Sequence, residues 1–147
     1  MATHCASRHR EHCLALISES AQAFVEDRTL AGIREAKAGF QQDGQLDRLA
    51  RYHGDKARWV LDAWTETWLS PAFADWTLDT ELQRLDCPVL AIHGETDEFG
   101  SALHPQRIAA LTDGPARLLL MDGCGHVPHR ERPEAVLEAV IGFLGRA

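Results

Sequence analysis

The sequence contains no long apolar run. None of its 147 residues lies in a stretch that approaches the roughly 18 consecutive apolar residues needed to cross a lipid bilayer. The first 13 residues, MATHCASRHREHC, also lack an apolar segment followed by a small-residue cleavage site, which is the pattern of a secretory signal. These two absences predict a cytoplasmic protein that has no membrane partner.

Positive charge is also scarce. The chain has 15 Lys and Arg residues against 22 Asp and Glu residues, which gives a formal net charge of −7. Nucleic acids are bound through clustered Lys and Arg side chains, and no such cluster occurs, so the sequence predicts no nucleic-acid partner. Apolar residues make up 45% of the chain and charged residues 25%, which is ordinary for a soluble domain with a buried core.

Cysteine is too sparse to form a disulfide framework. The four cysteines are scattered along the chain, so reduced thiols are the expected state: Cys5, Cys13, Cys87 and Cys124. Cys5, His9 and His12 could share one face of a helix, and zinc accepts such ligands. However, no paired C-x-x-C accompanies them. We therefore predict no metal site, and no motif in the sequence calls for another cofactor.

Short apolar runs and amphipathic segments alternate along the chain. The runs predict strands at residues 13–17, 88–93 and 117–121. The periodic segments predict helices at residues 2–9, 56–69, 104–112 and 133–144. Residues 20–53 are polar and helix-prone, and Gly44 and His53-Gly54 interrupt the segment. Strands separated by helices predict a parallel sheet with crossover connections.

Two groups suited to acid–base chemistry follow neighbouring predicted strands. Asp97 comes after the strand at 88–93, and His126 comes after the strand at 117–121. Ligands bind beyond the carboxyl ends of parallel strands, and adjacent strands lie about 4.8 Å apart, so these two side chains are expected to meet. An imidazole can take the proton of a hydroxyl nucleophile, and a carboxylate can stabilise the imidazolium that forms.

The same two segments resemble the α/β-hydrolase family. Residues 87–97, CPVLAIHGETD, resemble the acid-bearing strand of that family, and residues 123–128, GCGHVP, resemble its histidine loop. The residues that follow the loop extend the resemblance: Glu131, Pro133-Glu134 and the closing Phe143-Leu144. The order of acid and then histidine is also the order in the family. The resemblance implies that Asp97 is the catalytic acid, that His126 is the catalytic base, and that no cofactor is needed.

The resemblance also implies a fold and a division of the chain. The expected fold class is α/β, namely the C-terminal part of an α/β-hydrolase parallel sheet with flanking helices and a helical cap insertion. Residues 1–20 would form a core helix and strand, residues 21–83 the cap, and residues 84–147 the C-terminal core.

One part of the family pattern is missing. No serine lies between two glycines in a G-x-S-x-G elbow, and no oxyanion-hole loop can be recognised. We therefore expect this chain to be a fragment or the product of an internal start codon, and to be inactive alone. An in-frame elbow sequence just upstream in the gene would support that expectation.

Several further residues have both a functional and a structural interpretation. All four tryptophans lie within residues 59–76, and Trp64 and Trp68 are predicted to contact an apolar substrate, although core packing is the alternative. His93 ends a predicted strand and is a candidate substrate contact, although strand-end histidines are commonly just hydrogen-bonded. Structural roles are preferred for Glu98 as a solvated neighbour, Cys124 as a small packed residue and His129 as a support of the histidine loop.

The predicted function is a serine-type hydrolase of an ester or a related small apolar substrate, represented here by its acid, its base and its cap. Other reactions share these motifs, so the reaction subtype stays open. A second hypothesis is a non-catalytic remnant that acts as an interaction module. In either case the strand at 13–17 would have an unpaired apolar edge, which predicts a homo-oligomer formed through that edge.

Overall fold

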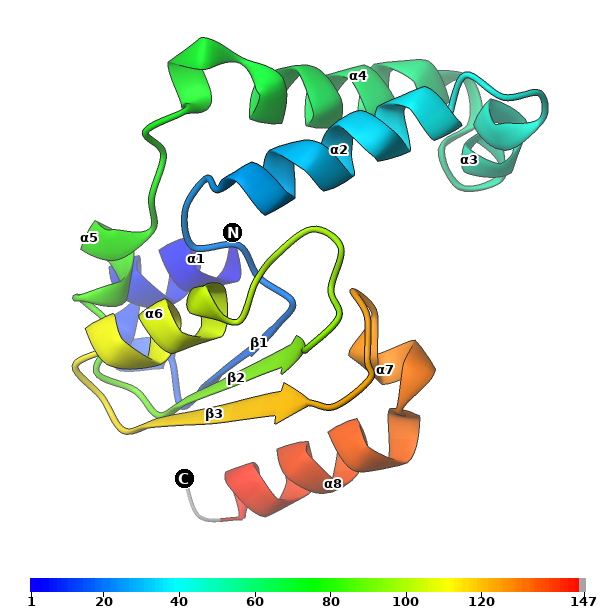
Figure 1. Cartoon of the computed structure of the whole chain (residues 1–147). Coiled ribbons are helices and arrows are strands. Elements are labelled where there is room, and N and C mark those ends of the chain that lie inside the picture. The colour runs from blue at the N-terminus through cyan, green and yellow to red at the C-terminus, as the bar shows by residue number, and fades with distance from the viewer. Residues whose placement is uncertain (146–147) are drawn as a thin grey trace. The chain divides into compact units, whose positions relative to one another are not determined.

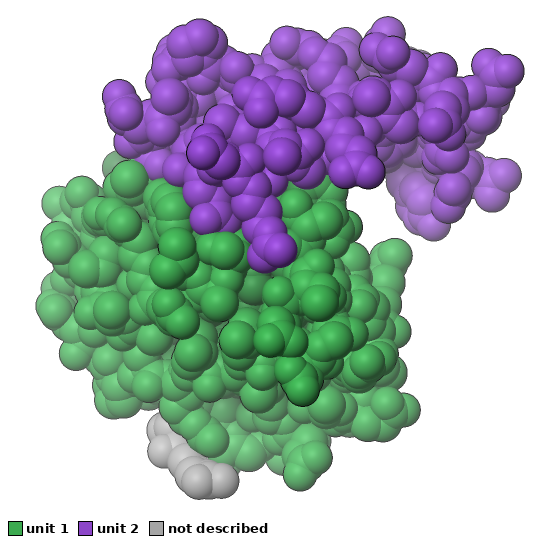
Figure 2. All heavy atoms as spheres, viewed as in Figure 1, with its two compact units in different colours: residues 1–24, 77–147 green, residues 25–76 purple. Residues whose placement is uncertain are grey.

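The structure is a computed structural model that describes residues 1–145, and these divide into two compact units (Figures 1 and 2). Unit 1 contains residues 1–24 together with the chain from residue 77 onward, and unit 2 contains residues 25–76. Within the described residues, no helix is both long enough and apolar enough to cross a membrane.

Unit 1 is built on a three-stranded parallel sheet. Its strands are β1 (Leu16–Glu19), β2 (Val89–Gly94) and β3 (Ala116–Met121), in the order β1-β2-β3. Every residue of the central strand β2 is buried, which explains its nearly continuous apolar sequence. The predicted α/β fold class is correct, and the predicted strands at 88–93 and 117–121 agree with β2 and β3 to within one residue at either end.

The predicted bounds of the first strand, 13–17, are wrong. The chain first makes a 3₁₀ turn, η1 (Arg10–His12), in which the Cys13 N–H donates to the Arg10 carbonyl over 3.1 Å. Leu14 is 88% exposed, and pairing begins only where Leu16 lies beside Val89. Five consecutive apolar residues do not by themselves fix where a strand begins, and the turn decides it here.

Helices cover both faces of the sheet (Figure 1). One face packs against α1 (Ala2–Arg8), α5 (Asp79–Leu82) and α6 (Leu103–Leu111). The other face packs against α8 (Pro133–Leu144), which follows the short helix α7 (Pro128–Glu131). Side chains alternate along β2. Val89 and Ala91 therefore pack in the hydrophobic core on the face covered by α1, α5 and α6, and Leu90 and Ile92 pack in the core on the face covered by α8. The predicted helices at 2–9, 104–112 and 133–144 are each confirmed to within one residue.

Unit 2 is helical. It contains α2 (Asp27–Gly39), α3 (Gln45–His53), η2 (Gly54–Lys56), α4 (Ala57–Leu69) and η3 (Pro71–Phe73). Gly44 (φ 76°) and Gly54 (φ 57°) both adopt the left-handed region that favours glycine, and they separate the helices as the sequence predicts. α4 ends before Pro71, and the Ser70 hydroxyl accepts a hydrogen bond from the Ala72 N–H over 3.2 Å.

The chain leaves unit 1 and returns to it at neighbouring points. Phe24 and Thr77 form an isolated antiparallel bridge, and the Leu78 N–H donates to the Ala23 carbonyl over 2.8 Å. Unit 2 is therefore an insertion between β1 and β2. The cap range inferred from the sequence, 21–83, is wider than this unit, because residues 21–24 and 77–83 belong to unit 1.

Candidate active site

Asp97 lies in a tight turn that follows β2. Its side chain is fully buried, and its Oδ1 accepts a hydrogen bond from the Phe99 N–H over 2.8 Å. The Asp97 N–H in turn donates to the carbonyl of Gly94, the last residue of β2, over 3.2 Å. These bonds hold the carboxylate close to the carboxyl end of the central strand.

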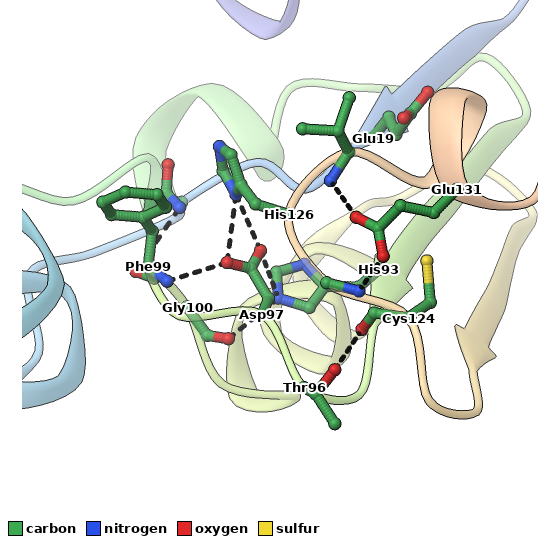
Figure 3. Close-up of polar contacts among 12 residues, drawn as sticks. Glu19, His93, Thr96, Asp97, Phe99, Gly100, Cys124, His126 and Glu131 are labelled. Carbon is green, nitrogen blue, oxygen red and sulfur yellow. Dashed lines mark hydrogen bonds and ion pairs between the residues drawn. The ribbon is translucent and has the colours of Figure 1, made fainter. Parts of the chain in front are cut away.

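His126 lies in the loop that follows β3 and meets this carboxylate (Figure 3). Its Nδ1 is 2.9 Å from Oδ2 and 3.0 Å from Oδ1 of Asp97, and its side chain is 33% exposed. The Phe99 ring packs edge-on against the imidazole with centroids 4.8 Å apart. Because both carboxylate oxygens are acceptors, Nδ1 carries the hydrogen, which leaves Nε2 of a neutral ring able to accept a proton. The structure thus brings together the two residues that the sequence singled out.

The two loops are also tied together through the backbone. The Glu95 N–H donates to the Met121 carbonyl over 3.0 Å, and both the N–H and the hydroxyl of Thr96 donate to the Cys124 carbonyl over 2.9 Å. Gly94 lies so close to the histidine loop that a methyl group there would overlap the carbonyl oxygens of Cys124 and Gly125. A glycine is therefore required where β2 passes this loop.

Glu131 in α7 fixes the backbone on both sides of His126. Its Oε2 accepts from the Gly125 N–H over 2.7 Å, and its Oε1 accepts from the Val127 N–H over 3.1 Å. These backbone hydrogen bonds hold the pKa of Glu131 below its usual value. The sequence analysis named Glu131 only as part of the family resemblance and gave it no role. Its position five residues after His126 was the one feature of the sequence that could have indicated this contact.

The contact between Asp97 and His126 shifts the pKa values of both groups. Burial acts to raise the pKa of Asp97, but hydrogen bonds from His126 and the Phe99 N–H outweigh it, so the pKa is lowered. The hydrogen bond to Asp97 raises the pKa of His126, burial opposes this, and the negative charge of Asp97 adds to the rise. The arrangement favours a carboxylate facing an imidazole that accepts a proton readily.

His93 approaches Asp97 from inside the protein. Its ring is fully buried, and its Nε2 lies 3.1 Å from the Gly100 carbonyl oxygen and 3.3 Å from Asp97 Oδ2. Both neighbours are acceptors, so Nε2 carries the hydrogen. That His93 contacts a substrate stays a prediction, and its burial favours a role in holding Asp97.

The two tryptophans predicted to contact substrate lie in unit 2. Trp68 packs edge-on against Phe73, with centroids 5.2 Å apart, and against Trp76, with centroids 5.4 Å apart. Trp64 is half-buried in α4. Packing accounts for the position of Trp68, and a substrate contact for either residue stays a prediction.

The structure also describes the three neighbouring candidates. Glu98 is exposed, and Cys124 is fully buried, which raises the pKa of its thiol. The N–H and Nδ1 of His129 lie 2.9 Å and 2.7 Å from Glu19 Oε1, so His129 ties α7 to the end of β1. Within residues 1–145, no group of three or more His, Cys, Asp or Glu side chains is arranged to hold a metal ion.

Comparisons with known proteins agree with this architecture. Epoxide hydrolase A of Mycobacterium tuberculosis (strain ATCC 25618 / H37Rv) is 35% identical over 68 residues, which make up 46% of this chain and 21% of that protein. A membrane phospholipase A described as a bacterial virulence factor matches 98% of this chain and 53% of its own, with a TM-score of 0.73 and 22% identity. A serine hydrolase involved in carbazole degradation matches 97% of this chain and 58% of its own, with a TM-score of 0.69 and 22% identity.

The extent of these matches is uneven. The chain spans between about half and three fifths of the length of the two solved structures and about a fifth of the epoxide hydrolase. At 22% identity, the likeness to the solved structures establishes the fold alone. The model of the alpha/beta hydrolase family, in contrast, matches residues 6–139, which is most of the sequence. On that match, the chain belongs to the alpha/beta hydrolase family.

Proposed function

We propose that this chain supplies the acid and the base of a serine-type hydrolase that acts on an ester or a related small apolar substrate. The observation that carries the proposal is the contact of His126 Nδ1 with Asp97 Oδ2 at 2.9 Å, made between two neighbouring strand ends. In this role His126 takes the proton of the nucleophile through Nε2, and Asp97 stabilises the imidazolium that results.

The nucleophile in this proposal comes from residues outside the printed sequence, because the sequence has no G-x-S-x-G elbow. Without a nucleophile and oxyanion donors, the chain alone retains only weak attack by water assisted by His126. The names of the relatives refer to epoxide, phospholipid and carbazole chemistry. Those names favour no single reaction, so the proposal stops at the substrate class.

We further propose that the helical segment within residues 21–83 is a cap over the substrate, and that Trp64 and Trp68 present apolar surface to it. A cytoplasmic location is part of the same proposal. It is supported by the four scattered cysteines of the sequence, which form no disulfide framework and are expected to be reduced in such a compartment.

Hydrolysis of p-nitrophenyl acetate tests the role of His126. Wild-type turnover is expected to fall at least about tenfold in His126→Ala, because a general base contributes that much or more. His129→Ala is the matched control, since His129 is an exposed histidine that contacts Glu19 rather than Asp97. Its turnover is expected to match that of the wild type.

Wild-type turnover no higher than that of His126→Ala contradicts chemistry in this polypeptide. That outcome favours the second candidate, a non-catalytic remnant that acts as an interaction module. The observations in its favour are the missing elbow and a sheet whose strand β1 pairs on one side only among the described residues.

We also propose that copies of the chain associate through the β1 edge. Three apolar side chains of α8 are exposed, namely Leu137 at 59%, Ile141 at 62% and Leu144 at 52%. The opposite flank of α8, with Ala135 and Ala139, borders a hollow lined by β3. The exposed apolar flank therefore points toward the β1 side of the sheet.

Light scattering and sedimentation test this association. The wild type is expected to form dimers or larger assemblies, and Ile141→Glu to shift the population toward monomer, because a charge is costly to bury in an apolar interface. Leu103→Glu, an exposed leucine of α6, is the matched control, and Leu118→Glu tests the competing β3 edge. A monodisperse wild-type monomer at high concentration contradicts the proposal.

A further inference from the structure

Two cysteines that are far apart in the sequence meet in the core of unit 1. The Sγ atoms of Cys13 and Cys87 are 3.4 Å apart, although the residues are separated by 74 positions. Cys13 lies between η1 and β1, and Cys87 lies two residues before β2. A disulfide bond is about 2.05 Å long, so the sulfurs need to approach by only about 1.4 Å to form one.

One member of this pair is accessible from the surface. Cys13 is half-buried and lines an open, largely apolar hollow of about 310 Å³ beside α1. The hollow is also lined by Ala2, Cys5, Ala6, His9, His12 and Leu16. Cys87 is buried behind Cys13 and is not part of that lining. The pair therefore has an outer thiol that a small molecule can reach and an inner thiol that it cannot.

We propose that Cys13 and Cys87 form a reversible thiol-modification site that takes low-molecular-weight disulfides such as glutathione disulfide. In the first step the Cys13 thiolate attacks one sulfur of that disulfide, the S–S bond breaks, and one glutathione thiolate leaves. In the second step the Cys87 thiolate attacks Cys13 Sγ and expels the second glutathione. The two cysteine protons end on the two glutathiones, so the protein dithiol is oxidised and the disulfide is reduced.

The second step is expected to be slow at neutral pH. Burial, the neighbouring Cys13 thiol and the charge of Asp86 together raise the pKa of Cys87 to about 11. The charge of Asp86 is in turn paired with Arg10, whose guanidinium lies 2.6 Å from it. Because only the thiolate attacks, the rate of the second step is expected to rise about tenfold between pH 7 and pH 8.

Intact-mass measurement of the whole chain during incubation with glutathione disulfide tests the site. In the wild type, Cys13 is expected first to gain one glutathione and then to lose it, which leaves in the digest a Cys13–Cys87 peptide two hydrogens lighter than the two reduced peptides. Cys87→Ser is expected to stop at the mixed disulfide, and Cys13→Ser to leave Cys87 unmodified. Cys5→Ser is the matched control, because Cys5 lines the same hollow, and it is expected to cross-link as the wild type does.

Thermal unfolding supplies a second readout that needs no variant. The cross-link closes a long loop that includes unit 2, so the oxidised wild type is expected to melt about 5 °C or more above the reduced form. A mixed disulfide at Cys13 of the wild type that never loses its glutathione, or a cross-link between Cys5 and Cys13, would overturn the proposal.

Discussion

At the scale of single residues, the protonation of His126 depends on one carboxylate. Asp97→Asn removes the negative charge and replaces one acceptor oxygen, so the raised pKa of His126 is expected to return toward its ordinary value of 6.5. Nitrogen-15 NMR titration of the histidines measures this directly. The assigned signal of His129, which contacts Glu19 instead, serves as the internal control. An unchanged His126 titration in the variant contradicts the role given to Asp97.

The same contact predicts how stability depends on pH. The folded-state pKa of His126 is raised, so its contribution is complete below pH 6.5 and is lost as the pH rises through that pKa. The folded-state pKa of Asp97 is lowered, so its contribution is present above its ordinary value of 3.8 and is lost as the pH falls through the folded value. The difference in free energy of unfolding between the wild type and Asp97→Asn is therefore expected to be largest between pH 3.8 and pH 6.5. Urea unfolding at pH 5.5 is expected to show a larger difference than urea unfolding at pH 9.

The buried ring of His93 provides a second test at this scale. His93→Leu removes the donor to the Gly100 carbonyl and the polar neighbour of Asp97 Oδ2, so the turn that holds Asp97 is expected to loosen. Hydrogen exchange at His126 Nδ1 is expected to speed up about tenfold, the effect of losing one hydrogen bond near a charge. His93→Gln keeps an N–H at a similar reach and is expected to restore slow exchange. Equal exchange in both variants would mean that His93 only fills space.

At the scale of elements, the close passage of β2 against the histidine loop is the most sensitive feature of the site. Gly94→Ala places a methyl group where the carbonyls of Cys124 and Gly125 lie, and backbone atoms cannot move aside cheaply. The variant is expected to separate His126 from Asp97 and to lower the His126 pKa, which the same titration detects. Gly142→Ala is the control, because a methyl group there meets nothing within 4 Å.

Three of the elements that the sequence predicted well share one property. β2, β3 and α8 have a glycine or proline at or near each end and a clear pattern of apolar residues, so local sequence decides them. The meeting of Asp97 with His126 could also be predicted, because parallel neighbours bring their carboxyl ends to the same edge.

The contacts that escaped prediction depend on tertiary packing. The start of β1 is decided by a turn, and the bonds of Glu131 to the amides around His126 require α7 to fold back on its own loop. The burial of His93 behind Asp97 depends on how the turn after β2 closes. No periodicity in the sequence contains that information.

At the scale of the whole molecule, the division into two units predicts how unfolding is distributed. Ile92 is buried in the core of unit 1, and Ile92→Ala is expected to cost about 2–5 kcal/mol there. Loss of the His126 signals in urea is therefore expected to occur at a lower concentration in the variant. The unfolding midpoint of unit 2 is expected to change much less. A common shift of both midpoints would mean that the units unfold as one cooperative body.

The positions of the tryptophans allow the unfolding of unit 2 to be followed without an added fluorescent label. All four tryptophans and the single tyrosine lie within residues 25–76, so near-ultraviolet absorbance and intrinsic fluorescence come almost entirely from unit 2. The unit that contains Asp97 and His126 is optically silent at those wavelengths. A denaturation curve recorded by fluorescence alone thus describes the unfolding of unit 2. Even a sharp two-state transition in that curve would not report whether unit 1 is still folded.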